Sequence, residues 1–376
     1  MSNTRSRRSR FGLSSVLAAA AVSAVLVAGW PPAAAHAVRS PKKAIWGPTQ
    51  MGGVLSQFPI YQRLGVRIYQ MTLHWDEVAV NRPLHGTNRH DPAYRWPPDV
   101  DYAVGEAHDA GIKVALTVFG APRWANGGQP PQYAPRRVQD LSAFLKAAAN
   151  RYPTVHLWRI WDEPNRHENF EPLVPEVPGQ RFGPAQRAAP RRYARMLDAA
   201  YATLKRASKS NLVIGGNTTT TGDISPLHWI RSMRLPQDRR PHLDLYGHDP
   251  FSTRPPNLDQ PELGTGLADF ADLDTLATWV DKYLKRSRPH LQLFVARYSV
   301  PSDHPPRGQT FSVNRQTQAQ WLKDALHIAE VWPRIYAFGW SDLYDEPPTA
   351  ARDESNAGLL DWQGNRKPAY FAYRDG

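Results

Sequence analysis

Short apolar runs alternate along the chain with longer stretches in which apolar residues recur every three or four positions. In the stretch 191–208, Met196, Leu197, Ala200 and Leu204 have the spacing of one face of a helix. The alternation predicts eight strands, at 44–47, 66–73, 112–118, 155–161, 212–216, 243–248, 291–297 and 335–340. It predicts helices between them, among others at 101–110, 138–150, 191–208, 273–285 and 315–331.

Strands and helices that alternate over most of the 376 residues indicate an α/β fold with a parallel sheet. Closed on itself, this sheet is a single (β/α)8 TIM barrel, whose usual size of ~250 residues leaves room for long loops. An open doubly wound sheet is the alternative, but no glycine-rich phosphate turn follows the first predicted strand. Long polar loops at 166–190 and 252–268 are expected on the C-terminal face, where barrels build substrate sites. No repeat or linker marks a second domain, so we expect one barrel over residues 38–376.

The N-terminal segment has the pattern of an export signal. Four arginines between positions 5 and 10 precede an apolar, alanine-rich stretch at 11–29, and Ala35-His36-Ala37 resembles a cleavage site. A membrane anchor is the alternative, because the apolar stretch is close to the ~20 residues that span a bilayer. We expect residues 1–37 to be removed and the mature chain to begin near Val38. The protein would then be secreted, either extracellular or associated with the cell wall, with no stable membrane insertion.

The composition limits which binding partners and which kinds of catalytic site are expected. The chain has 46 Lys and Arg against 34 Asp and Glu, and residues 1–37 contribute four of the arginines, so the mature chain is still basic. Acidic polysaccharides and cell-wall polymers suit such a charge. Nucleic acid is not expected, since no basic run with interleaved aromatics and no nucleic-acid module is present. Zero cysteines exclude disulfides and thiol nucleophiles. No zinc-type histidine spacing, calcium loop or serine-hydrolase elbow is present, so neither metal nor cofactor is expected.

The most informative motif is Trp161-Asp162-Glu163-Pro164-Asn165, at the end of the fourth predicted strand. In isolation, such a strand-terminal acid could simply form a surface ion pair. The motif resembles the Trp-Asn-Glu-Pro-Asn signature of the retaining, cellulase- and β-xylosidase-like clan of barrel glycoside hydrolases. The resemblance implies that Glu163 is the general acid/base and that Asp162 contacts the sugar 2-hydroxyl. Asn165 is implied to be a further substrate contact, and the ligand is implied to be a carbohydrate.

Other strand ends are similar to those of the same clan. Trp75 follows the second predicted strand, Trp124 lies in the turn after the third, and Trp340 ends the eighth. His248 ends the sixth. Aromatic faces stack on the apolar surface of sugars and histidines bind hydroxyls, so we expect these side chains to line the barrel mouth. Each tryptophan taken singly is as easily explained as part of the core.

The seventh strand departs from the clan. The resemblance places a nucleophilic Glu at its end, but here the sequence reads Ala296-Arg297-Tyr298. A guanidinium is always protonated and cannot attack an anomeric carbon, whereas Tyr298 is able to bond a carboxylate. We expect Arg297 and Glu163 to face each other across the barrel mouth. Arg297 near Asp162 and Glu163 is also explained by an ion network that only holds the mouth together.

Three functions therefore remain open from the sequence. The first is a glycoside hydrolase that cleaves O-glycosidic bonds with a substitute carboxylate, for which the candidates are Asp303, Asp342, Asp345 and Glu346. The second is a catalytically inactive barrel that still binds saccharide. The third is a variant enzyme in which Arg297 binds the anionic group of a sugar, because guanidinium matches planar oxyanions. The distance from Glu163 to another carboxyl would separate the first function from the second.

Overall fold

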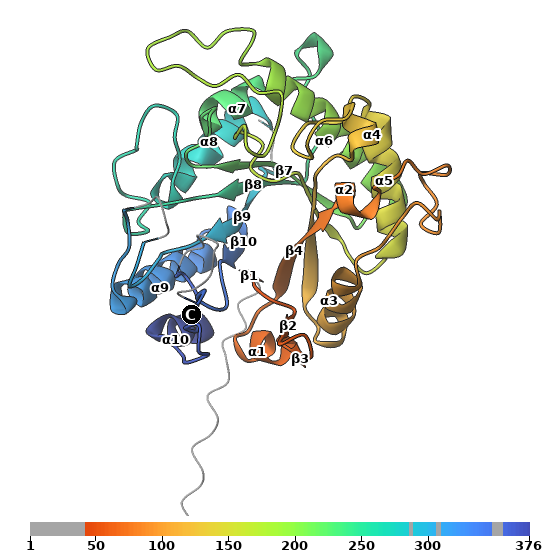
Figure 1. Cartoon of the computed structure of the whole chain (residues 1–376). Coiled ribbons are helices and arrows are strands. Elements are labelled where there is room, and N and C mark those ends of the chain that lie inside the picture. The colour runs from red at the N-terminus through yellow and green to blue at the C-terminus, as the bar shows by residue number, and fades with distance from the viewer. Residues whose placement is uncertain (1–41, 286–288, 306–309, 348–355) are drawn as a thin grey trace, which may run out of the picture. The chain divides into compact units, whose positions relative to one another are not determined.

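The computed structural model describes residues 42–285, 289–305, 310–347 and 356–376. Eight parallel strands form a closed barrel in which the first strand pairs with both the second and the last (Figure 1). The barrel strands are β1 Lys43–Trp46, β4 Ile68–His74, β5 Lys113–Phe119, β6 Leu157–Ile160, β7 Leu212–Thr219, β8 Leu245–Asp249, β9 Gln292–Tyr298 and β10 Ile335–Trp340. All eight coincide with predicted strands, and the (β/α)8 barrel is confirmed. The predicted signal segment, residues 1–37, lies outside the described residues.

Five long helices lie between successive strands, as predicted. They are α3 Pro98–Asp109, α5 Val138–Arg151, α6 Ala188–Ala207, α8 Leu273–Tyr283 and α9 Arg315–Val331. Helix α6 begins three residues earlier than predicted. Pro190 lies in its first turn, where a missing N–H would have had no helical partner in any case. The predicted long loops follow β6 and β8, and the longer of them ends where α6 begins.

Several shorter elements were not predicted from the sequence. They are α1 Phe58–Arg63, α2 Trp75–Val78, α4 Arg123–Asn126, α7 Pro226–Ser232, α10 Pro368–Asp375, the 3-10 turns Pro236–Asp238 and Phe270–Asp272, and the hairpin strands β2 Gln50–Met51 and β3 Leu55–Ser56. Most of these elements are too short to show a helical or strand period, so only their packing on the barrel reveals them. Helix α10, for example, packs beside α9 (Figure 1).

The interior is built in two layers. All eight strands place apolar side chains on the barrel axis, namely Ala44, Ile68, Ala115, Leu157, Ile214, Leu245, Phe294, Ala296 and Ala337. A larger apolar layer fills the space between the barrel and its helices and contains several large aromatic side chains, including Trp158 and Trp229. The filled axis makes the barrel a rigid support, so binding sites form at its ends. Within the described residues, no helix combines the length and the apolar character needed to cross a membrane.

Candidate active site

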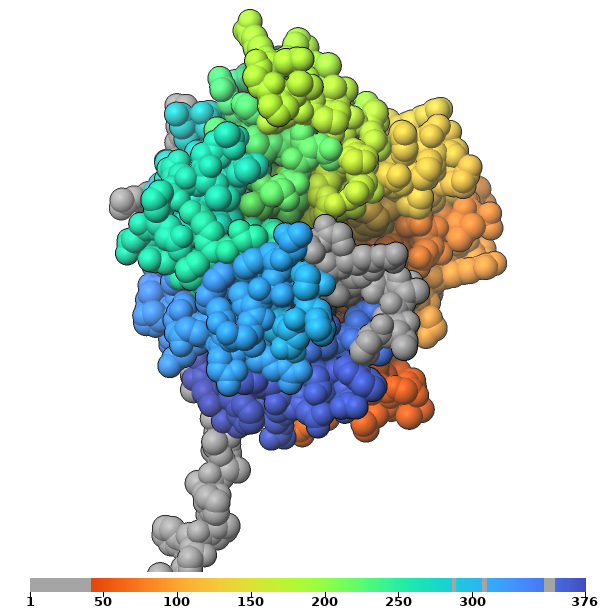
Figure 2. Space-filling model, turned by 60° about the vertical axis from the view of Figure 1, so that its left-hand side comes forward, coloured from red at the N-terminus to blue at the C-terminus, as the bar shows by residue number. Residues whose placement is uncertain are grey.

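The carboxyl ends of three strands bring charged side chains to one cavity of about 520 Å³. Glu163 follows β6, Asp249 ends β8 and Arg297 lies near the end of β9, and all three line this cavity. Glu163 and Arg297, which were predicted to face each other across the barrel mouth, thus line the same cavity. Arg166, Thr219 and Phe251 also line the cavity. Figure 2 shows the segment after β6, in yellow-green, projecting at the upper edge of the molecule.

Asp249 is the site residue that the sequence analysis missed. Its signal was present, because Asp249-Pro250 repeats at the end of β8 the arrangement of Glu163-Pro164 after β6. In both places an acid at a strand end is followed directly by a proline, which cannot continue the ladder of strand hydrogen bonds. The sequence analysis predicted the neighbouring His248 as the site residue of this strand.

A buried arginine joins the two acidic strand ends. Arg159, on β6, is only 1% exposed, and its guanidinium forms ion pairs with Asp162 at 2.7 Å and with Asp249 at 2.5 Å. Its Nε donates a hydrogen bond of 3.1 Å to Asn217 Oδ1. The side-chain amide of Asn217 in turn donates to the carbonyl oxygens of Ile160 and Trp161. Asp162 is thus held by the protein itself, and the turn that carries Glu163 is tied to β7.

The charges of this network shift the pKa values of its members. Burial raises the pKa of Asp249 to about 7 against the effect of Arg159, and the charges of Asp162 and Glu163 add to the increase. Burial would also raise the pKa of Asp162, but the charges of Arg159 and Arg297 outweigh it and lower the pKa. For Arg297, the neighbouring carboxylates outweigh burial and raise the pKa, so the guanidinium stays charged. The pKa of Asp249 therefore lies well above the ordinary value of an aspartate.

Glu163 lies in a tight turn directly after β6. Trp161 and Glu163 adopt φ angles of +66° and +36°, in the left-handed region that side chains other than glycine rarely occupy. Such conformations cost on the order of 1–3 kcal/mol and are concentrated at functional sites. The Glu163 carboxylate forms an ion pair of 3.1 Å with Arg166, which is bound on its other side by Glu168. The turn thus presents a carboxylate to the cavity at a cost in backbone energy.

A β-bulge sets the direction of Arg297. Phe338 and Trp340 of β10 pair with Val295 and Tyr298 of β9, so β9 has one extra residue at this point. Because of it, Arg297 lines the cavity while Tyr298 packs in the helix-facing layer. The Arg297 guanidinium lies over the ring of Trp46, 4.7 Å from its centroid. A cation in this position is attracted by the ring face.

Three of the predicted aromatic contacts are buried away from the cavity. Trp75, Tyr298 and Trp340 have no exposed surface. Trp75 opens α2 and stacks on Phe144 of the helix layer, and the indole N–H of Trp340 donates to the Ala357 carbonyl. A fully buried ring cannot stack on a sugar, so these three strand-end aromatics belong to the core. For the tryptophans, the sequence analysis had left this alternative open.

Three other predicted contacts have structural partners. Trp124 is half-buried, its indole N–H donates to the Ala79 carbonyl, and it does not line the cavity. The buried Asn165 amide donates to the Thr219 and Ile224 carbonyls. His248 is also buried and has contacts of 3.0 Å with Thr218 Oγ1 and the Ala268 carbonyl. Burial lowers its pKa to about 4. These side chains hold neighbouring strand ends and loops together.

The four carboxylates named as substitutes for the missing Glu do not line this cavity either. Asp303 forms an ion pair with Arg315, and the buried Asp345 pairs with Lys367. Asp342 acts on Arg297 through its charge. Among the described residues, no group of three or more His, Cys, Asp or Glu is placed to hold a metal ion.

No protein-family model matches the chain, and no curated protein matches it. Solved structures do match. One is a family 39 glycoside hydrolase from the gut symbiont Bacteroides cellulosilyticus WH2, with a TM-score of 0.62 and 17% identity over 90% of this chain. The chain spans only 64% of the length of that enzyme.

Two further structures agree. A monomeric β-xylosidase from Caulobacter crescentus CB15 matches 90% of this chain and 68% of its own length, with 19% identity and a TM-score of 0.56. Xylanase 10B from Thermotoga maritima matches 89% of this chain and 94% of its own length, with 15% identity and a TM-score of 0.54. The chain has the fold of barrel glycoside hydrolases. At these identities the comparison establishes the fold, and the activity has to be argued from the site.

Proposed function

We propose that the protein is a secreted glycoside hydrolase that cleaves O-glycosidic bonds of an oligo- or polysaccharide. In this proposal Glu163 and Asp249 are the two working carboxyls, one as general acid and the other as general base. The observation that carries it is the presence of both carboxyls, from different strand ends, in one cavity. Glycoside hydrolysis uses such a pair across the scissile bond. The likeness of the fold to a xylosidase and a xylanase supports the same reaction class.

The electrostatics of the pair suit acid–base chemistry near neutral pH. Burial, with smaller contributions from the charges of Asp162 and Glu163, raises the pKa of Asp249 to about 7, so this carboxyl is able to carry a proton below that pH. Two carboxyls whose surroundings differ in this way are able to supply one acid and one base. The acid protonates the leaving glycosidic oxygen as its bond to the anomeric carbon breaks. The carboxylate takes a proton from the water whose oxygen bonds to that carbon.

Arg297 decides which mechanism we propose. It lies next to the end of the strand on which the resembled clan carries its nucleophile, and a guanidinium has no lone pair to form a glycosyl intermediate. Direct attack by water, with inversion at the anomeric carbon, is therefore proposed instead of retention. In this proposal the positive charge of Arg297 partly neutralises the surrounding carboxylates. Arg297 also lines the cavity, where it is able to contact an oxyanion of the substrate.

The test compares Glu163→Gln, Asp249→Asn and the unmodified protein on aryl glycosides and oligosaccharides. Each variant is expected to lose about 10²-fold or more in kcat, the usual contribution of a positioned acid or base. Asp303→Asn is the matched control, because Asp303 is an acid outside the cavity and should leave kcat unchanged. Hydrolysis should also fall as the pH rises through about 7, when Asp249 loses its proton.

A second candidate function is saccharide binding without hydrolysis. Two ion pairs favour it, because Glu163 is bound by Arg166 and Asp249 by Arg159. The same assay separates the two functions. If the unmodified protein binds oligosaccharides but hydrolyses none of a broad panel, the binding function is the correct one.

Secretion is part of the proposal and has its own test. We propose cleavage before Val38, from the arginine-led apolar segment and the Ala35-His36-Ala37 triplet. Mass spectrometry of protein from the culture medium should give a chain that begins near Val38. Intact residues 1–29 in the secreted material would contradict this prediction.

A further inference from the structure

Five arginines line a second hollow of about 410 Å³ beside the barrel mouth. They are Arg181, Arg187, Arg191, Arg231 and Arg234. We propose that this hollow binds the carboxylate or sulfate groups of an acidic polysaccharide, a segment of which occupies the cavity of Glu163. The inference rests on the proposed function and names the class of substrate for it.

The hollow has a strong excess of positive charge. Its arginines come from the loop after β6, from the N-terminal end of α6 and from α7 with the residues that follow it. No acid occurs in the sequence between Glu176 and Asp198. Among the described residues that line the hollow, Asp238 is the only acid, and its side chain is 85% exposed beside Arg234. One exposed carboxylate does not offset five guanidinium groups.

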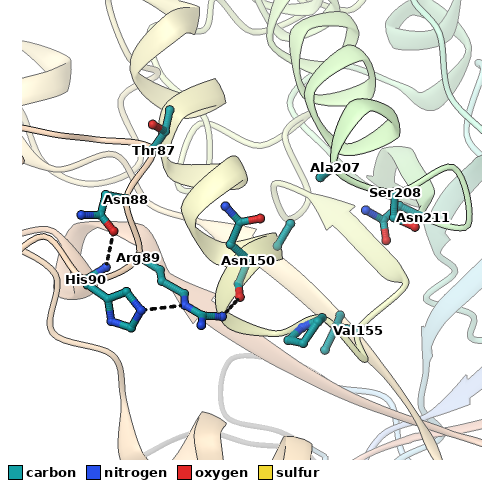
Figure 3. A pocket seen from close by; sticks show the side chains of 11 residues that line it. Thr87, Asn88, Arg89, His90, Asn150, Val155, Ala207, Ser208 and Asn211 are labelled. Atoms are coloured by element: carbon teal, nitrogen blue, oxygen red, sulfur yellow. Dashed lines mark hydrogen bonds between the residues drawn. The ribbon is translucent and has the colours of Figure 1, made fainter.

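In another hollow, the guanidinium of an arginine is hydrogen-bonded by groups of the protein itself. Near the amino ends of β6 and β7, Arg89 donates to the backbone carbonyl of Asn150 and to His90 Nε2 (Figure 3). Around the five-arginine hollow, Arg187 and Arg234 donate to the carbonyls of Phe182 and Met233 in the same way. Arg181, Arg191 and Arg231 have exposed side chains that line the shared space. Guanidinium groups gathered in this way repel one another. An oxyanion bound between them attracts each of them and so offsets that repulsion.

The hollow is connected to the proposed active site. Arg181, Phe182 and His228 line both it and a neighbouring cleft of about 530 Å³. That cleft is also lined by Gly222 and Asp223, and the preceding residue, Thr221, lines the cavity of Glu163. Consecutive residues after β7 thus line the cleft and the cavity of Glu163, so the carboxyl pair and the arginines lie on the same group of loops, those after β6 and β7. A chain of several sugars fits this arrangement better than a small anion.

An aromatic group lies where the cleft meets the five-arginine hollow. The ring of Phe182 stacks on the imidazole of His228, with centroids 4.5 Å apart and an angle of 12° between the planes. The Nδ1 atom of this imidazole has a 2.8 Å contact with the Glu176 carboxylate. Aromatic carbon beside guanidinium groups offers both apolar contact to a sugar ring and charge for its acidic substituents. This combination favours an acidic saccharide over a simple inorganic ion.

The test measures binding by calorimetry to an oligogalacturonate, a sulfated oligosaccharide of similar length and the neutral xylotetraose. We expect at least one acidic probe to bind, and Arg181→Gln/Arg191→Gln/Arg231→Gln to weaken that binding about tenfold or more, with xylotetraose unchanged. The matched control is Arg63→Gln/Arg67→Gln/Arg206→Gln. It removes the same charge from exposed arginines near the amino ends of strands. Raising the salt concentration from 0.05 to 0.5 M should weaken acidic binding in the parent more than in the first variant.

Each outcome bears on the proposal. Preference for the uronate or for the sulfate probe identifies the anionic group. Equal weakening by both triple variants, or no binding of either acidic probe, overturns the proposal. Binding of an oligothymidylate through the same arginines with equal affinity also overturns it, because the hollow would then accept any polyanion. Glu163→Gln separates this inference from the proposed function, since it should abolish hydrolysis and leave acidic binding intact.

Discussion

Arg297 lies over the indole of Trp46, with its guanidinium carbon 4.7 Å from the ring centroid, while its charge acts on Glu163, Asp162 and Asp249. The contact holds a cation at the end of β9, on the wall of the cavity that contains Glu163. This guanidinium is charged and cannot act as a nucleophile. Replacing Arg297 therefore tests directly whether a carboxylate at this position supports hydrolysis.

Arg297→Glu is expected to create hydrolysis with retention. The change removes a cation and places a carboxylate in the cavity of Glu163, where like charges raise the pKa of one group and leave the other ionised. We expect the variant to hydrolyse an aryl β-glycoside faster than the unmodified protein, with the anomeric configuration followed by NMR.

The control for this experiment is Glu163→Gln in both backgrounds. Loss of the new activity in Arg297→Glu/Glu163→Gln would show that the pair works together. A folded Arg297→Glu protein that is inert on a broad glycoside panel would contradict the prediction and strengthen the saccharide-binding function.

Arg159→Met is expected to destabilise the protein by about 3–5 kcal/mol, because it leaves Asp162 and Asp249 buried without the cation that joins them. Urea denaturation measures the free energy of unfolding. Arg206→Met, at an exposed position of α6, is the matched control and should change it by less than about 0.5 kcal/mol. A similar small change in Arg159→Met would mean that the ion network carries little stability.

Gly339→Ala tests the bulge that directs Arg297. A Cβ at position 339 would lie 2.1 Å from the Ala296 carbonyl oxygen, which the bulge turns toward Trp46 and Gln70 as a hydrogen-bond acceptor. Backbone cannot move aside cheaply, so we expect a loss of about 3 kcal/mol in the free energy of unfolding. Gly105→Ala is the control. Gly105 lies in α3 with open space around its Cα and should gain about 1 kcal/mol.

His248 should make the protein sensitive to acid. Its pKa falls to about 4 in the folded state, mainly because it is buried, so the unfolded chain binds its proton first as the pH falls below about 6.5. Stability should therefore decrease between pH 6.5 and pH 4, by about 3 kcal/mol from this group at pH 4. In His248→Gln, the free energy of unfolding should depend less on pH across this window. An unchanged pH dependence would contradict the assignment.

The sequence by itself determined the order and kind of the main elements. All eight barrel strands and five long helices were predictable. The strands are short apolar runs because the barrel buries both of their faces, and the five helices are long enough to show a helical period. It also pointed to Glu163, through the resemblance of the motif Trp161-Asp162-Glu163-Pro164-Asn165 to the signature of barrel glycoside hydrolases. Residue types and spacing alone left a surface ion pair equally possible.

Tertiary structure decided everything that depends on direction. Trp75, Tyr298 and Trp340 stand near strand ends as predicted, but whether a strand-end ring faces the mouth or the helices depends on register and on bulges. The single extra residue in β9 reverses the faces that Arg297 and Tyr298 would otherwise take, so that Arg297 lines the cavity and Tyr298 packs against the helices. The pKa of Asp249 and the shared hollow of the arginines of α6 and α7 depend on neighbours that lie tens of residues away in the chain. A sequence pattern shows which side of an element is apolar, and only packing shows which charges that element meets.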